Sequence, residues 1–135
     1  MHETIYKKIL PDASRNMEII ITDNKYIKEI QEEFQRRFPY LKIEFFRNAT
    51  QKGSSTPKSQ IIPGKMAIGM VRHTHVEGAL NIDGSRSVEE IENDFQNKFG
   101  LSVEIFRKSG NMWIETTLTH HWSLLRQNFE GQQMS

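Results

Sequence analysis

Histidine side chains are the first residues in this sequence that could do chemistry. Four of the five form two groups, His73 with His75 and His120 with His121. Imidazoles two residues apart on a strand point to the same face, so His73 and His75 could bind zinc, nickel or copper with a third ligand such as His120. Because no carboxylate lies at a familiar ligand spacing, surface or capping histidines are the preferred interpretation. We therefore expect neither a metal nor another cofactor.

Two carboxylates offer a second possibility. Glu104 and Glu115 fall on neighbouring strands of a predicted hairpin and could form a pair for acid–base catalysis. Their alternation with apolar residues is explained more simply by the solvent side of a sheet. The sequence has no nucleophile elbow, no phosphate-binding loop and no dinucleotide fingerprint, and its lack of cysteine removes thiolate catalysis and cysteine-bearing zinc sites. The motifs do not favour an enzyme.

Basic residues with a nearby tryptophan suggest a binding surface. Residues 36–65 contain seven lysines and arginines but a single acidic residue, Glu44. An anion or a nucleic acid could be bound by a set drawn from this stretch and from the turn after residue 106: Arg47, Lys52, Lys58, Arg107, Lys108 and Trp113. Cations would follow the phosphates while the indole stacks on a base. Against this, the net charge is only +1, and the aromatic signature of sheet-platform RNA binders is missing.

Protein interaction is the preferred hypothesis. A strand predicted over residues 112–117 forms the last strand of a hairpin, and an edge strand offers backbone groups to which another chain can add a strand. We therefore expect a non-catalytic interaction module that self-associates or binds a protein partner through this edge. Nucleic-acid binding and a histidine metal site stay as alternatives.

An internal repeat must position all of these residues. Residues 18–47 match residues 79–107 at an offset of 61 and then, after one extra residue in the first copy, of 60. The match places Ile19 on Leu80 and Phe34 on Phe95, and it holds at the apolar positions of a strand, a helix and a second strand. The sequence therefore predicts two β-α-β units.

Two such units predict an α+β fold, a two-layer sandwich that is ferredoxin-like in kind, with an added C-terminal hairpin strand and helix. Ser87 and Glu90 form a predicted capping box, and Gly100 a predicted left-handed helix end. The expected organisation is an N-terminal tail (1–16), a single domain (17–130) and a C-terminal tail (131–135). Within the domain we expect repeat one (17–47), a flexible loop (48–62), repeat two (78–107) and the final strand and helix (111–130).

Composition limits the class of protein. Hydrophobic residues make up 36% and charged residues 26% of the 135, which is ordinary for a single globular domain. No run of about 18 apolar residues occurs, and the N-terminal stretch lacks the hydrophobic segment of a signal peptide. We therefore expect a cytoplasmic protein without a membrane partner.

The last 50 residues carry a pattern that resembles a group of short uncharacterised bacterial proteins. The pattern is FRKSG followed by W, T and HHWSLLRQN, and its residues are Phe106, Arg107, Lys108, Ser109, Gly110, Trp113, Thr116, Trp122, Leu124, Gln127 and Asn128. The resemblance implies a bacterial intracellular protein and no particular activity.

Overall fold

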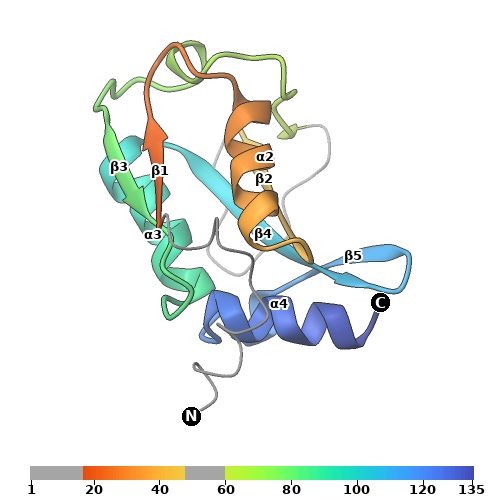
Figure 1. Ribbon diagram of the computed structural model, residues 1–135. Coiled ribbons are helices and arrows are strands. Elements are labelled where there is room, and N and C mark those ends of the chain that lie inside the picture. Colours follow the sequence, from red (N-terminus) through yellow and green to blue (C-terminus); the bar gives the residue numbers. More distant parts are fainter. Residues whose placement is uncertain (1–16, 48–59) are drawn as a thin grey trace.

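Figure 1 shows the computed structural model of the chain, which describes residues 17–47 and 60–135. The elements follow in the order β1 (Glu18–Ile21), α2 (Ile27–Arg37), β2 (Leu41–Phe46), η3 (Ile68–Met70), β3 (Gly78–Asn81), α3 (Val88–Phe99), β4 (Ser102–Ser109), β5 (Met112–Glu115), η4 (Thr117–Thr119) and α4 (Leu124–Gln133). The predicted α+β class is confirmed. The predicted tail over 1–16 and most of the predicted loop over 48–62 lie outside the described residues.

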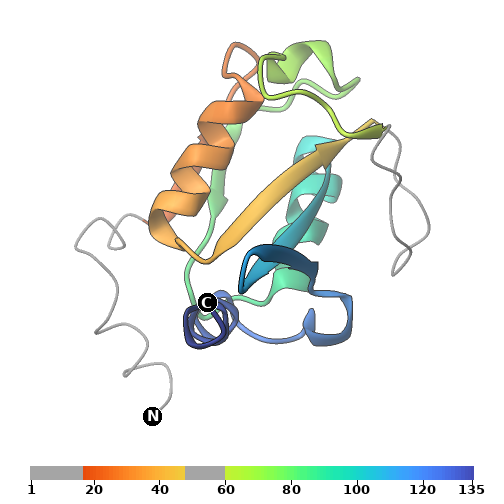
Figure 2. The same ribbon diagram turned by 90° about the vertical axis from the view of Figure 1, so that its right-hand side faces the viewer.

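The strands form two small antiparallel sheets. One sheet pairs β1 with β3, and the other has the order β2-β4-β5. A single ferredoxin-like sheet is therefore not confirmed, because the two strands of each β-α-β unit separate into different sheets. α2 lies beside β2, and α4 lies at the end of the molecule opposite η3 (Figures 1 and 2). Both sheets and all three helices contribute to one apolar core.

The pairing registers fit the internal repeat. Ile19 lies directly opposite Leu80, its counterpart at an offset of 61. In the other sheet Glu44 lies directly opposite Glu104, its counterpart at an offset of 60. A residue faces its own counterpart only where an approximate two-fold axis passes between them. Each sheet is therefore made by exchanging equivalent strands between the two units.

Equivalent aromatic residues fill the core. Phe34 of α2 and Phe95 of α3 are both fully buried. The Phe34 ring contacts Phe38 at 5.5 Å between centroids, and the Phe95 ring meets Phe45 edge-on at 5.6 Å. Phe34 and Phe95 lie on the helix faces that the three- and four-residue apolar spacing predicts. The two units thus supply matching halves of one core.

The repeat also contains a third element that is hard to see in the sequence. The segment before η3 pairs with the start of α2 through a bridge between Tyr26 and Ala67. The segment before α4 pairs in the same way with the start of α3, through Ser87 and Ser123. Met66 C=O accepts from the Ile27 N–H at 2.9 Å, and Trp122 C=O accepts from the Val88 N–H at 3.3 Å. α4 is therefore the counterpart of η3 and not simply an addition to the repeat.

Each of these junctions requires one glycine. Gly69 N–H donates to Asp23 C=O, and the equivalent bond runs from Leu125 N–H to Gly84 C=O. A Cβ at Gly69 would lie 2.8 Å from the Asp23 Cβ, and a Cβ at Gly84 would lie 2.3 Å from the Leu125 Cγ. The glycine therefore lies on the η3 side in one junction and on the β3–α3 side in the other.

Helix ends agree only partly with prediction. The Ser87–Glu90 capping box and the left-handed Gly100, with φ 65°, are confirmed. α4 begins after Ser123, whose side chain accepts from the Arg126 N–H. The expected helix end at Gly131 is wrong, since α4 continues to Gln133. A Cβ on Gly131 would lie 2.9 Å from that of Tyr40, so this glycine permits close packing of α4.

Candidate interaction site

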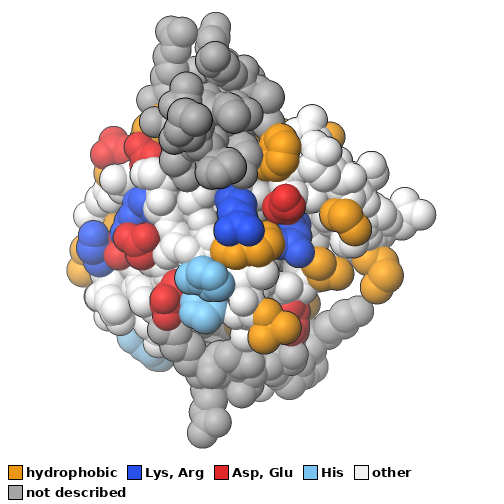
Figure 3. Space-filling view, turned by 90° about the horizontal axis from the view of Figure 1, so that it is seen from below, with side chains coloured by type: hydrophobic (Ala, Val, Ile, Leu, Met, Phe, Trp, Pro, Cys, Tyr) orange, Lys and Arg blue, Asp and Glu red, His pale blue; other side chains and the backbone are white. Residues whose placement is uncertain are grey.

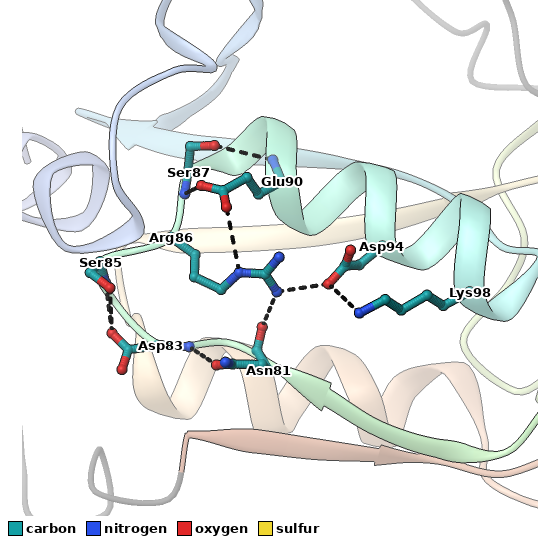
Figure 4. A network of polar contacts seen from close by, with 8 residues as sticks. All are labelled: Asn81, Asp83, Ser85, Arg86, Ser87, Glu90, Asp94 and Lys98. Atoms are coloured by element: carbon teal, nitrogen blue, oxygen red, sulfur yellow. Dashed lines mark hydrogen bonds and ion pairs between the residues drawn. The ribbon is translucent and has the colours of Figure 1, made fainter.

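The edges of the β1–β3 sheet are occupied by cations. Lys25 Nζ donates to Ile20 C=O at 2.7 Å and pairs with Glu33 at 2.7 Å. In the second unit Arg86 Nη1 donates to Asn81 C=O at 2.8 Å and pairs with Asp94 at 2.7 Å, as Figure 4 shows. Burial raises the pKa of Asp94, but the hydrogen bond from Arg86 and the charges of Arg86 and Lys98 outweigh it and leave the pKa lowered.

The same network orders the start of α3 (Figure 4). Arg86 Nε lies 3.8 Å from the Glu90 carboxylate, and Glu90 also accepts from the Ser87 N–H at 3.0 Å. Asp83 accepts from both the N–H and the hydroxyl of Ser85. One arginine thus joins the strand edge, the connecting turn and the helix.

The outer edge of β2 is also occupied. Gln31 of α2 donates to Ile43 C=O at 2.8 Å. Farther along, the Ile62 N–H donates to Phe45 C=O at 2.8 Å, and the Arg47 N–H donates to Gln60 C=O at 3.0 Å. The end of the segment predicted as a flexible loop, residues 60–62, is therefore bound to this strand. These bonds occupy the outward C=O groups of Ile43 and Phe45 and the N–H of Arg47, so another chain cannot pair with them.

The first half of β4 is closed by side chains. Glu92, the counterpart of Gln31, accepts from the Ile105 N–H at 3.1 Å. The buried hydroxyl of Thr116 donates to Ile105 C=O at 2.7 Å. Beyond Ile105, β5 takes over the edge, with Arg107 opposite Ile114 and Ser109 opposite Met112. The three-stranded sheet therefore ends at β5.

β5 differs from the other edges. Its hairpin turns at Gly110, where φ is 61°, and Asn111 has a negative φ, which together suit a type II′ turn. In this geometry Ser109 and Met112 form the closing hydrogen-bonded pair, and the backbone groups of Trp113 point away from β4. In the part of the chain that the structure describes, no hydrogen bond reaches the outward N–H or C=O of Trp113. The β5 edge at Trp113 is thus available for pairing.

Side chains on the outer face of this sheet surround Trp113. Lys42 Nζ lies 5.4 Å from the Trp113 ring centroid and 5.6 Å from that of Phe106. Lys108 Nζ lies 5.4 Å from the Trp113 ring. Alternation along the strands places three carboxylates on the same face: Glu44, Glu104 and Glu115. The face therefore carries both signs of charge and is not a basic platform.

The predicted basic set is divided by the fold. Lys108 and Trp113 lie together, but Arg107 points to the opposite face, where it donates to Gln127 at 2.8 Å and lies 5.3 Å from the Trp122 ring. Arg47 follows the other end of β2, because Leu41 at the start of that strand is the residue opposite Arg107. Lys52 and Lys58 lie outside the described residues. Among the predicted cations that the structure describes, Arg47, Arg107 and Lys108, only Lys108 contacts Trp113.

The histidines are separated as well. His75 Nδ1 lies 2.9 Å from the Asp23 carboxylate, which also accepts from the buried Arg72 at 2.7 Å. The hydrogen bond from Arg72 holds the pKa of Asp23 below its usual value, more strongly than desolvation raises it. His73 and His75 lie in an irregular segment and not on the strand that the metal hypothesis assumed. Among the described residues no group of three or more possible metal ligands occurs.

The other histidine pair lies next to α4. The rings of His120 and His121 are 6.1 Å apart and nearly perpendicular, and His120 Nε2 lies 3.5 Å from Glu89. Figure 3, seen from the α4 side, shows histidine, basic and hydrophobic side chains together on this face. Arg126 stacks on Trp122 at 3.8 Å. These contacts attach the segment before α4 to α3, which is a structural role.

The sequence reasoning missed the residues that close the other edges. Lys25 and Arg86, Glu33 and Asp94, and Gln31 and Glu92 all obey the offset of 61. The repeat was predicted from its apolar matches, although the same comparison also contains these polar matches.

No protein-family model, curated protein or solved structure matches this chain. The resemblance to short bacterial proteins therefore stays a prediction. Among the described residues no helix is both long enough and apolar enough to span a membrane.

Proposed function

We propose that the protein is an interaction module that pairs the outer edge of β5 with an extended strand of a protein partner. One contrast supports this most directly. Side chains or neighbouring backbone occupy outward groups at Ile20, Asn81, Ile43 and Ile105, whereas the outward groups of Trp113 have no such partner among the described residues. Proteins commonly protect strand edges, and an unprotected one is a template for another chain.

The side chains next to this edge suit a strand partner. Met112 is 67% exposed at the start of β5, and Trp113 is partly exposed. A strand laid against β5 would gain backbone hydrogen bonds at Trp113 and would cover part of the indole and the thioether. β5 has only four residues, so the added strand is short and the contact is expected to be weak and reversible.

Panning a random peptide library on the wild-type protein tests this function. We expect bound peptides to shift the NMR signal of the Trp113 amide and to slow its exchange with solvent. Trp113→Pro removes the outward N–H, and Trp113→Ala is the matched control that loses the same ring but keeps the N–H. Peptides should bind the alanine variant at least about tenfold more tightly than the proline variant. Equal binding to both variants would refute edge pairing.

Nucleic-acid binding remains the alternative because Lys42 and Lys108 both lie near the Trp113 ring. Titration of labelled single-stranded RNA and DNA at two salt concentrations tests it, since phosphate contacts weaken steeply with salt. Three carboxylates on the same sheet face argue against it. The cytoplasmic location expected from the sequence also stays a prediction.

A further inference from the structure

We propose that the strand added to β5 is β5 of a second copy, arranged about a two-fold axis that passes between the two Ile114 residues. The inference rests on the proposed function and names its partner. It would join two three-stranded sheets into one six-stranded sheet with the order β2-β4-β5-β5-β4-β2. The register follows from the hydrogen-bonding pattern of β5.

Only one two-fold register uses the whole strand. Backbone groups that point away from β4 belong to Trp113 and, by alternation, Glu115. Pairing Trp113 with the partner's Glu115 forms two hydrogen-bonded pairs, one on each side of the axis. Pairing Trp113 with itself leaves Glu115 opposite the turn residue Asn111, and pairing Glu115 with itself places two carboxylates in contact. The first register is therefore the one favoured.

Charge supports the same register. On the outer face, the partner's Glu115 would lie beside Trp113, whose ring is already accompanied by Lys108 Nζ at 5.4 Å. Each copy thus places a carboxylate, which also has a contact within its own chain, next to the other copy's cation and aromatic ring. By two-fold symmetry this contact occurs twice, so each charge change would act twice on the dimer.

Apolar side chains on the other face of β5 also meet in this arrangement. Ile114 would face its own copy in the close, non-hydrogen-bonded pair at the axis. The exposed Met112 would lie diagonally across from the partner's Ile114. Met134, which is 62% exposed, is held near the hairpin because its C=O accepts from the Gly110 N–H. Figure 3 shows exposed hydrophobic side chains on the side where Figure 1 places the hairpin and the C-terminus.

Paired charge variants provide the test. Glu115→Lys and Lys108→Glu each place like charges together in their own homodimer. In a one-to-one mixture, only the heterodimer brings residues 108 and 115 of the Glu115→Lys chain, both lysine, opposite residues 115 and 108 of the Lys108→Glu chain, both glutamate. Both intermolecular pairs are then attractive. Contacts within each monomer stay unfavourable in the mixture, so recovery of the dimer would report contacts between copies.

Sedimentation velocity from about 10 µM to 1 mM covers the weak range expected for a short edge. We expect the wild type and Trp113→Ala to dimerise, the proline variant at position 113 to dissociate at least about tenfold more readily, and the two charge variants to dimerise only when mixed. Circular dichroism confirms that each variant is folded. If the proline variant does not fold, the mixing experiment alone decides.

Two results would overturn the inference. One is a wild-type protein that stays monomeric at 1 mM, the upper end of the range tested, where even a weak specific dimer is expected to form. The other is a mixture of charge variants that dimerises no better than either variant alone. A monomeric protein whose Trp113 amide is still protected by library peptides would refute only the second-copy partner. A monomeric protein without such peptides would refute the proposed function as well.

Discussion

Gly84→Ala should destabilise the protein through a single contact. A Cβ at this position would lie 2.3 Å from Leu125 Cγ and 2.8 Å from each of its Cδ atoms. Ordinary carbon contacts are near 4 Å, so either Leu125 or the junction backbone must move. Leu125 is almost completely buried, and it therefore has little space in which to move.

The expected cost is that of an overpacked core, about 1–3 kcal/mol in the free energy of unfolding. For a domain of this size that lowers the melting temperature by roughly 3–12 °C. Leu125→Ala alone should cost about 2–5 kcal/mol, because it leaves a cavity in the core. In the Leu125→Ala background the three clashing atoms are gone, so Gly84→Ala should cost less than about 0.5 kcal/mol or stabilise slightly.

Urea unfolding of the wild type, both single variants and the double variant completes the cycle. The glycine of the other junction, Gly69, lies on the opposite side of its junction and faces Asp23 and not Leu125, so it serves as a control: Gly69→Ala should be destabilising in both backgrounds. Additive effects of Gly84→Ala and Leu125→Ala would refute the junction packing. They would also weaken the equivalence of α4 and η3 that depends on it.

Other contacts give three further predictions. Ser87→Ala removes the acceptor for the Glu90 N–H and should cost about 1 kcal/mol, measured by thermal unfolding. The pKa of Asp94 is lowered in the folded protein, so its ionised carboxylate stabilises the fold above about pH 4, and this contribution is lost as the pH falls through the folded-state pKa. Asp94→Asn should therefore be less stable than the wild type at pH 7. In urea titrations the difference between the two proteins should be smaller near pH 3. Gln127→Ala leaves Arg107 without its amide partner in a buried site and should cost about 1–3 kcal/mol, measured in the same way; an unchanged midpoint would contradict that contact.

Local signals in the sequence were sufficient for the elements of the repeat. The three- and four-residue spacing of Ile27, Ile30 and Phe34 predicts the buried face of α2, and all three are fully buried. Ser87 and Gly100 bound α3 as predicted because helix ends depend on a few neighbouring residues. These features require no knowledge of which strands pair.

Strand pairing could not be predicted from the sequence because it joins distant residues. Periodicity showed that β1 and β2 have inward and outward faces, but not that β1 pairs with β3 and β2 with β4. Ile20 illustrates the consequence: residues 17–22 form a nearly continuous apolar run, which is typical of a strand covered on both faces, yet Ile20 is half exposed. Exposed and buried residues alternate along β1, so only one of its faces lies on the core.

The candidate site was predicted in part. Turn chemistry at Ser109–Gly110 and the strand pattern after it predicted the hairpin and its edge. The grouping of Arg107 with Lys108 failed because adjacent strand residues point to opposite faces. Whether an edge is open depends on side chains from other elements, such as Glu92 and Gln31, and that information lies in the tertiary structure.

Hydrogen exchange at the Trp113 amide tests the central claim most directly, because this is the outward N–H on which edge pairing depends. In dilute wild-type protein we predict that it exchanges quickly, while the Ile114 amide, which pairs back to Arg107, is protected. At concentrations where the dimer forms, or with a bound strand peptide, the Trp113 amide should become protected as well. An amide that is already protected in the dilute monomer, or that stays unprotected in every complex, would contradict the account.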